Sequence, residues 1–122
     1  MKHFYTVSAV FELGGGLALL GVPSATAQLL VGAALQGPVP LTVARVGGGG
    51  LFALGLACWH ARGDAQNRAA RGVAAAMLSY NVLVAAVLAF AGLGLGLHGL
   101  ALWPAVVLHA AMAVWCVVVL VR

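Results

Sequence analysis

Long apolar runs separated by short polar stretches dominate the chain. Four of these runs are long enough to cross a membrane, and we expect them at residues 4–21, 41–60, 73–91 and 101–121. A bilayer core of about 30 Å needs roughly 20 apolar residues in helical form. Lipid offers the backbone no hydrogen-bond partners, and the runs lack the strict alternation of strands. The sequence therefore predicts an all-α fold, a single antiparallel bundle of four transmembrane helices over residues 1–122.

The longest connection, residues 22–40, carries an apolar piece of its own. Pro23 suits the first turn of a helix, and Ser24 lies near the cap position. The apolar run Leu29–Leu35 follows and ends at a Gly-Pro pair. At about 1.5 Å per residue this piece is too short to span a bilayer. We expect a short interfacial helix that either covers the ends of the other helices or forms a lid over a cavity.

Composition excludes several classes of protein. Hydrophobic residues make up 64% of the chain and charged residues 7%, whereas a soluble domain carries about a quarter charged residues. Six Lys and Arg stand against two Asp and Glu. Basic residues this scattered do not form a groove for phosphates, so no nucleic-acid partner is expected. The expected partner is the lipid bilayer.

The basic residues outside the spans fall on one side of the predicted bundle. Lys2 precedes the first span, three arginines lie between the second and third spans, and Arg122 follows the fourth. The other two connections carry no Lys, Arg, Asp or Glu. Because basic residues mark the cytoplasmic side, we expect a bacterial inner-membrane protein with both termini in the cytoplasm. An alternative stays open: residues 1–27 resemble a cleavable signal peptide, although Glu12 interrupts its apolar region.

Two runs of glycine lie at similar depth in the first and second spans. They comprise Gly14, Gly15 and Gly16 in the first span and Gly47, Gly48, Gly49 and Gly50 in the second. Missing side chains at a shared depth let two backbones approach closely. We therefore expect these spans to cross at the glycines. A GxxxG pair, Gly92 and Gly96, indicates self-association at the outer end of the third span.

Each span also carries a polar side chain that is costly in lipid. These are the candidate ligand or proton site residues Glu12, Arg45, Tyr80, Asn81 and His109. Such groups face the bundle interior and pair. Glu12 and Arg45 are the obvious ion pair, which Asn81 and His109 could complete by hydrogen bonds. Two interpretations remain open: the group lines a cavity that binds a ligand or relays protons, or it is a network that fixes one packing of the helices.

The sequence carries no motif for a metal site or for enzyme catalysis. No two histidines share a helix face at one depth, and no catalytic triad, dinucleotide fingerprint or zinc-protease motif is present. Cys58 and Cys116 are expected to be small core residues. We therefore predict no metal, no catalytic residue and no bound cofactor, although a quinone or a lipid would suit the polar site.

The second span carries a resemblance to a known family. It runs from Ala44-Arg45-Val46-Gly47-Gly48 through Leu54-Gly55-Leu56-Ala57-Cys58-Trp59 to Ala61-Arg62. This stretch, with an embedded Glu in the first span, resembles small bacterial four-helix membrane proteins of the DoxX-like type. The resemblance implies a four-helix membrane fold and, for some members, a link to quinone or thiol redox systems. No active site transfers, and the chain lacks a paired-Cys motif.

Three functions are consistent with these features. The first is a non-enzymatic subunit or ligand-binding module with a polar intramembrane site, acting as a homo-oligomer or within a larger membrane complex. The second is a small proton-coupled transporter that uses Glu12. The third is a redox accessory protein that binds quinone near His109 and Tyr80.

Overall fold

The computed structural model describes all 122 residues and contains helices and loops only. Four helices are long and apolar enough to cross a membrane. The predicted all-α bundle is thereby confirmed, and it indicates a multi-pass membrane protein. The second and third of these four long helices extend beyond their predicted spans at both ends. The helices are α1 (Lys2–Gly21), α2 (Pro23–Val31), α3 (Pro38–Ala61), the short 3-10 helix η1 (Arg62–Asp64), α4 (Arg68–Leu93) and α5 (Leu102–Val121).

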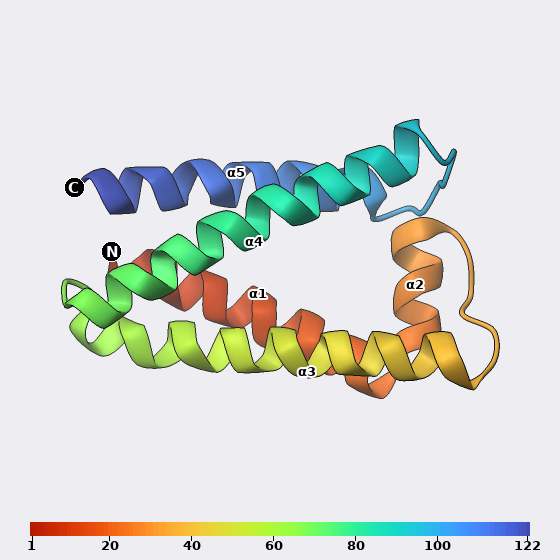
Figure 1. Cartoon of the computed structure of the whole chain (residues 1–122), viewed down its shortest axis with the longest axis horizontal. Helices are drawn as coiled ribbons and strands as arrows, with labels where there is room; N and C mark the ends of the chain where they lie inside the picture. The colour runs from red at the N-terminus through yellow and green to blue at the C-terminus, as the bar shows by residue number, and fades with distance from the viewer.

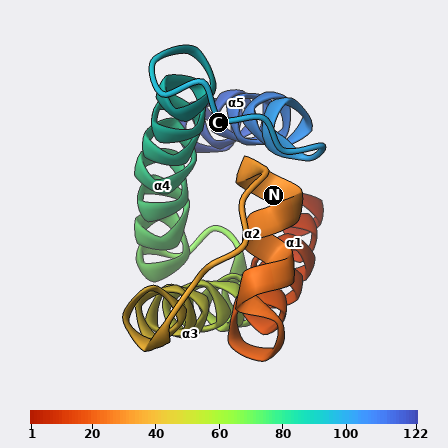
Figure 2. The ribbon, with the colours of Figure 1, turned by 90° about the vertical axis from the view of Figure 1, so that its right-hand side faces the viewer.

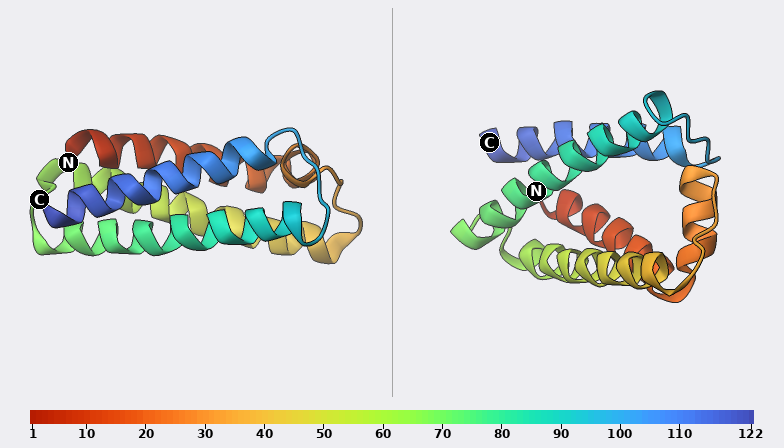
Figure 3. Two further views of the ribbon diagram at one scale, coloured as in Figure 1. Left: turned by 90° about the horizontal axis from the view of Figure 1, so that it is seen from above. Right: turned by 45° about the vertical axis from the view of Figure 1, so that its right-hand side comes forward.

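The four long helices form two pairs. Helix α1 packs along α3, and α4 packs along α5. Both chain termini and the α3–α4 connection lie at one end of the bundle, which we call the terminal end (Figure 1). The pairs converge there and diverge toward the opposite end, the α2 end, where α2 runs across the bundle (Figure 3). The helices therefore leave space between the pairs that side chains and α2 must fill.

Apolar packing closes the terminal end. Tyr5 of α1 donates a hydrogen bond from its hydroxyl to the Ala70 carbonyl of α4, at 2.8 Å. The Phe4 ring meets the Trp115 ring edge-on, with centroids 5.7 Å apart. These contacts join the two helix pairs. The buried residues of this terminal cluster are Phe4, Tyr5, Ala9, Cys58, Ala70, Ala74, Met77, Met112, Cys116 and Val119.

Glycines bring α1 and α3 together, as the sequence predicts. A Cβ atom on Gly16 would lie 2.6 Å from the Phe52 nitrogen, and one on Gly48 would lie 2.8 Å from Cβ of Leu19. These two positions make the predicted crossing, because any side chain there would force the backbones apart. Gly15 instead faces a cavity. The other members of the two runs, Gly14, Gly47, Gly49 and Gly50, have no neighbour within 4 Å of a Cβ position and make no helix contact.

Helix α2 is shorter than the apolar run suggested. It begins at Pro23, in the expected first turn, and stops at Gly32, whose φ of 80° is left-handed. The run up to Leu35 therefore leaves the helix. Ser24 does not cap α2: its hydroxyl accepts a hydrogen bond from the Leu35 backbone nitrogen at 3.1 Å and donates one to the Leu35 carbonyl at 3.3 Å. These bonds fold the segment after α2 back onto the helix.

The far end of α2 docks on the α4–α5 connection. The Ala101 backbone nitrogen donates to the Leu29 carbonyl at 2.9 Å. Gly99 lies directly against the Leu30 carbonyl, with no room for a side chain. Since α2 also follows α1 in the chain, it bridges the two helix pairs at the α2 end (Figure 2). A small apolar cluster of Leu88, Ala91 and Leu102 lies beneath this junction.

The predicted GxxxG motif for self-association is not formed. Helix α4 ends at Leu93, so Gly96 lies in the following loop, where its φ is 67°. Gly92 packs against Leu102 and Trp103 of the same chain. The motif needs both glycines on one helix face, and the helix stops before the second glycine is reached.

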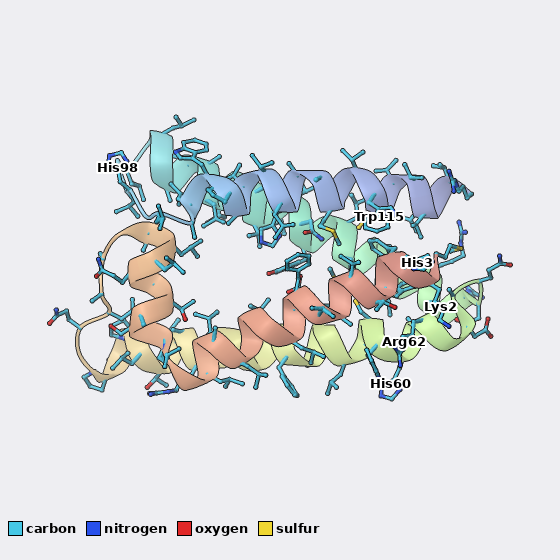
Figure 4. The ribbon with its side chains drawn as sticks, turned by 180° about the vertical axis from the view of Figure 1, so that it is seen from behind. Lys2, His3, His60, Arg62, His98 and Trp115 are labelled. Atoms are coloured by element: carbon cyan, nitrogen blue, oxygen red, sulfur yellow. The ribbon has the colours of Figure 1, made fainter.

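The outer surface of the long helices is apolar, as lipid contact requires. Large exposed side chains include Leu17, Val46, Leu83 and Val107. Charged and polar groups gather at the bundle ends. Figure 4 shows Lys2 and Arg62 at the terminal end, with His98 at the α2 end.

Candidate functional site

A cavity of about 310 Å³ lies between the two helix pairs. The terminal cluster bounds it toward one end, and α2 covers it toward the other. The five α-helices all contribute to its wall, which is mostly apolar. The lining residues are Phe11, Glu12, Gly15, Leu19, Thr26, Leu30, Leu51, Tyr80, Val84, Leu88, Ala105, Leu108 and His109.

Three of the five predicted site residues meet in this cavity. Glu12 of α1 is only 4% exposed, and its side chain lines the cavity together with that of Tyr80 from α4. The Tyr80 ring meets the His109 ring of α5 edge-on, with centroids 5.6 Å apart and planes at 82°. The three groups therefore form one polar patch on an otherwise apolar wall.

Asn81 supports this patch from behind. Its side chain is 1% exposed and does not line the cavity. Its amide nitrogen donates to the Met77 carbonyl at 2.7 Å, and its amide oxygen lies 2.8 Å from Nδ1 of His109. The first bond fixes the orientation of the amide, so the oxygen must face the histidine and accept a hydrogen bond from it. Asn81 thus holds the imidazole in place.

Arg45 does not join the patch, and the predicted Glu12–Arg45 ion pair is wrong. Arg45 is exposed, and its Nε donates to the Leu20 carbonyl of α1 at 3.2 Å. No basic nitrogen lies within 4.0 Å of the Glu12 carboxyl group. Arg45 occupies the outer face of α3, so its side chain reaches the end of α1 along the surface. Helix α3 approaches Glu12 as expected, but its arginine points elsewhere.

The sequence left the role of α2 open and did not identify the residues of this helix that line the site. Thr26 and Leu30 of α2 line the cavity, which gives this helix the lid position that was one of its two expected roles. Ser8, which was not predicted either, does not line the cavity: it is fully buried, and its Oγ has no hydrogen-bond partner. The available signal was spacing, because Ser8 lies four residues before Glu12 and shares its helix face.

The site offers a ligand three polar groups: one carboxyl group, one phenol and one imidazole. No group of three or more His, Cys, Asp or Glu side chains lies close enough together to hold a metal ion. Cys58 and Cys116 are free and buried in the terminal cluster. The arrangement can hold the polar end of a small molecule while the leucine and valine side chains contact an apolar remainder.

Comparison with known proteins finds no family model, no curated protein and no solved structure that matches this chain.

Proposed function

We propose that this protein is a non-catalytic ligand-binding module of a membrane, which holds a small amphipathic molecule in the cavity between its helix pairs. The observation that carries the proposal is the cavity itself. Its volume of about 310 Å³ falls within the range of small-molecule sites, about 300–1,000 Å³. Convergent polar groups on an apolar wall are typical of such sites, because they orient a ligand whose affinity comes mainly from apolar contact.

The packing at the terminal end favours binding over transport. A transporter needs access to its site from both sides of the membrane. Phe4, Tyr5 and Met77 fill the space between the helix pairs at the terminal end, and no residue of the terminal cluster lines the cavity. The site is therefore bounded on that side by a close-packed core rather than by a path.

A small proton-coupled transporter is the second candidate. It is favoured by one observation, the absence of a basic partner within 4.0 Å of Glu12. A membrane carboxyl group without a partner is a functional-site hypothesis by default. Proton flux into liposomes on addition of a lipophilic substrate would favour the transporter, whereas saturable binding without flux favours the module.

Native mass spectrometry of the full chain in mild detergent tests the proposal. We expect the protein to retain a small molecule or lipid of defined mass. Gly15→Leu places a side chain in the cavity and should remove that mass. Gly14→Leu is the matched control, because Gly14 has no neighbour within 4 Å. Equal retention by the two variants would contradict the proposal. The same spectra report the subunit count, which tests the expected homo-oligomer or larger complex.

We further infer that the membrane is a bacterial inner membrane and that the terminal end faces the cytoplasm. The support is the charge asymmetry. Basic residues mark the cytoplasmic side, and every Lys and Arg of this chain except Arg45 lies at a helix end that belongs to the terminal end: Lys2 begins α1, Arg62 follows α3, Arg68 and Arg71 lie in the first turn of α4, and Arg122 follows α5. Reporter fusions after residue 122 and near Gly99 should give cytoplasmic and periplasmic signals, respectively. A periplasmic signal after residue 122 would reverse the assignment.

A further inference from the structure

Each polar group of the cavity wall, Glu12, Tyr80 and His109, can offer a hydrogen-bond acceptor to a ligand. The Asn81 amide oxygen faces Nδ1 of His109 at 2.8 Å, so in the neutral ring the proton is on Nδ1 and Nε2 carries a lone pair. The Tyr80 side chain lines the same cavity as Glu12, and its hydroxyl oxygen can accept a hydrogen bond as well as donate one. The carboxylate itself only accepts hydrogen bonds.

No basic side chain of the chain pairs with Glu12. Glu12 is the sole acidic side chain within the membrane-spanning helices. Arg45, the only Lys or Arg within the four predicted spans, is bonded to Leu20 at the surface. A charge in the bilayer interior is stable only when it is paired or solvated. A cationic group in the cavity would supply the counter-charge that Glu12 lacks and would let its carboxyl group ionise.

We propose that the ligand is a small lipophilic amine, a monovalent organic cation whose ammonium N–H groups bind Glu12 and His109 while its hydrocarbon part lies along the apolar wall. The inference rests on the proposed ligand-binding function and names the chemical class of its ligand. An ammonium group supplies both the positive charge and several donors. A quinone is disfavoured, because its carbonyl oxygens would meet other acceptors. A metal ion is disfavoured too, since the site has one carboxylate and no ligand cluster.

The apolar wall fits this assignment. Leu30, Val84, Leu88 and Leu108 line the cavity on the α2, α4 and α5 sides. Their contact with an alkyl or aryl group would provide most of the affinity, while the ion pair selects the headgroup. The volume restricts the ligand to a small molecule rather than a two-chain lipid.

The experiment compares three probes of one chain length in nanodiscs of zwitterionic lipid: octylammonium, octan-1-ol and octyltrimethylammonium. Apparent affinity is measured from the rise in unfolding midpoint with probe concentration, because a ligand that binds the folded state raises it. We expect octylammonium to bind at least tenfold more tightly than either of the other probes. Octanol lacks the positive charge, and octyltrimethylammonium lacks N–H donors. This comparison needs no variant and does not depend on how a substitution folds.

Two carboxylate variants complete the test. Glu12→Gln should remove the preference for octylammonium, and Asp64→Asn, which removes the other carboxylate of the chain at the terminal end, should leave it intact. Equal binding of octylammonium and octanol, or an unchanged preference in Glu12→Gln, would overturn the amine assignment. In that outcome, loss of binding in Gly15→Leu but not Gly14→Leu would still support the ligand-binding function. If no probe binds and these glycine variants behave alike, the proposed function itself fails.

Discussion

The side-chain oxygen of Asn81 lies 2.8 Å from Nδ1 of His109 and determines which ring nitrogen carries the proton. The same amide donates to the Met77 carbonyl at 2.7 Å, so it cannot turn over without losing both bonds. Asn81 is buried on α4 and His109 is on α5. This hydrogen bond between α4 and α5 therefore fixes the orientation of the His109 side chain in the cavity.

The first prediction concerns this bond. When the His109 imidazole is uncharged, its ¹⁵N chemical shifts should show that the proton is on Nδ1. Asn81→Leu, which keeps the branched shape of the side chain but removes the acceptor, should produce a mixture of tautomers. It should also destabilise the fold by about 0.6 kcal/mol, the average for such bonds in a membrane, and by no more than about 1.7 kcal/mol. Ser79→Ala, at an exposed position two residues before Asn81, should change neither quantity. A pure Nδ1 tautomer in Asn81→Leu would show that Asn81 does not set it.

The second prediction separates the glycines by their neighbours. Gly16→Ala and Gly48→Ala should each destabilise the protein by roughly 1–3 kcal/mol, because the new methyl group would overlap backbone of the facing helix. Gly47→Ala and Gly49→Ala have open space at the same depth. They should be neutral or slightly stabilising, since alanine favours helix. Unfolding in mild detergent measures all four. Similar losses at all four positions would mean that helix flexibility, not close approach, explains the glycines.

The sequence predicts the membrane spans and one helix crossing, but not the direction of every side chain. The spans followed from apolar length, and the α1–α3 crossing followed from glycines at one depth. Depth is easily counted at about 1.5 Å per residue. The direction of a side chain around its helix is harder to predict, because it depends on which neighbour each face meets. Arg45 illustrates the limit: it lies on a helix next to Glu12, yet its side chain follows the outer surface to Leu20.

The cavity shows a second limit. Glu12, Tyr80 and His109 were expected to converge, and they do. The wall that α2 provides depends on backbone contacts between two loops, such as the hydrogen bond from Ala101 to Leu29. Such contacts leave no periodic pattern in the sequence. The apolar content of α2 predicted a short helix but could not say whether it covers helix ends or closes a cavity.

The third prediction tests the docking of α2. Gly99→Ala should loosen α2, because a methyl group there would collide with the Leu30 carbonyl. Hydrogen exchange of the α2 amides should accelerate, while exchange in the α1–α3 pair stays slow. Gly21→Ala is the matched control, since Gly21 ends α1 with no neighbour within 4 Å. Unchanged exchange in Gly99→Ala would mean that the α4–α5 connection does not hold α2 in place.

The last prediction is that Glu12 and Arg45 do not interact, contrary to the ion pair expected from their opposite charges. If Glu12 and Arg45 formed a buried ion pair, removing one partner would cost more than removing both. The structure instead bonds Arg45 to the Leu20 carbonyl at 3.2 Å, outside the cavity. Glu12→Gln and Arg45→Met should therefore act independently, and the free energy of unfolding of the double variant should equal the sum of the single changes within about 0.3–0.5 kcal/mol. A coupling energy above about 1 kcal/mol would place the two groups in contact. It would also supply Glu12 with a partner from the chain and remove the need for a cationic ligand. An additive cycle leaves the carboxyl group of Glu12 available to whatever enters the cavity.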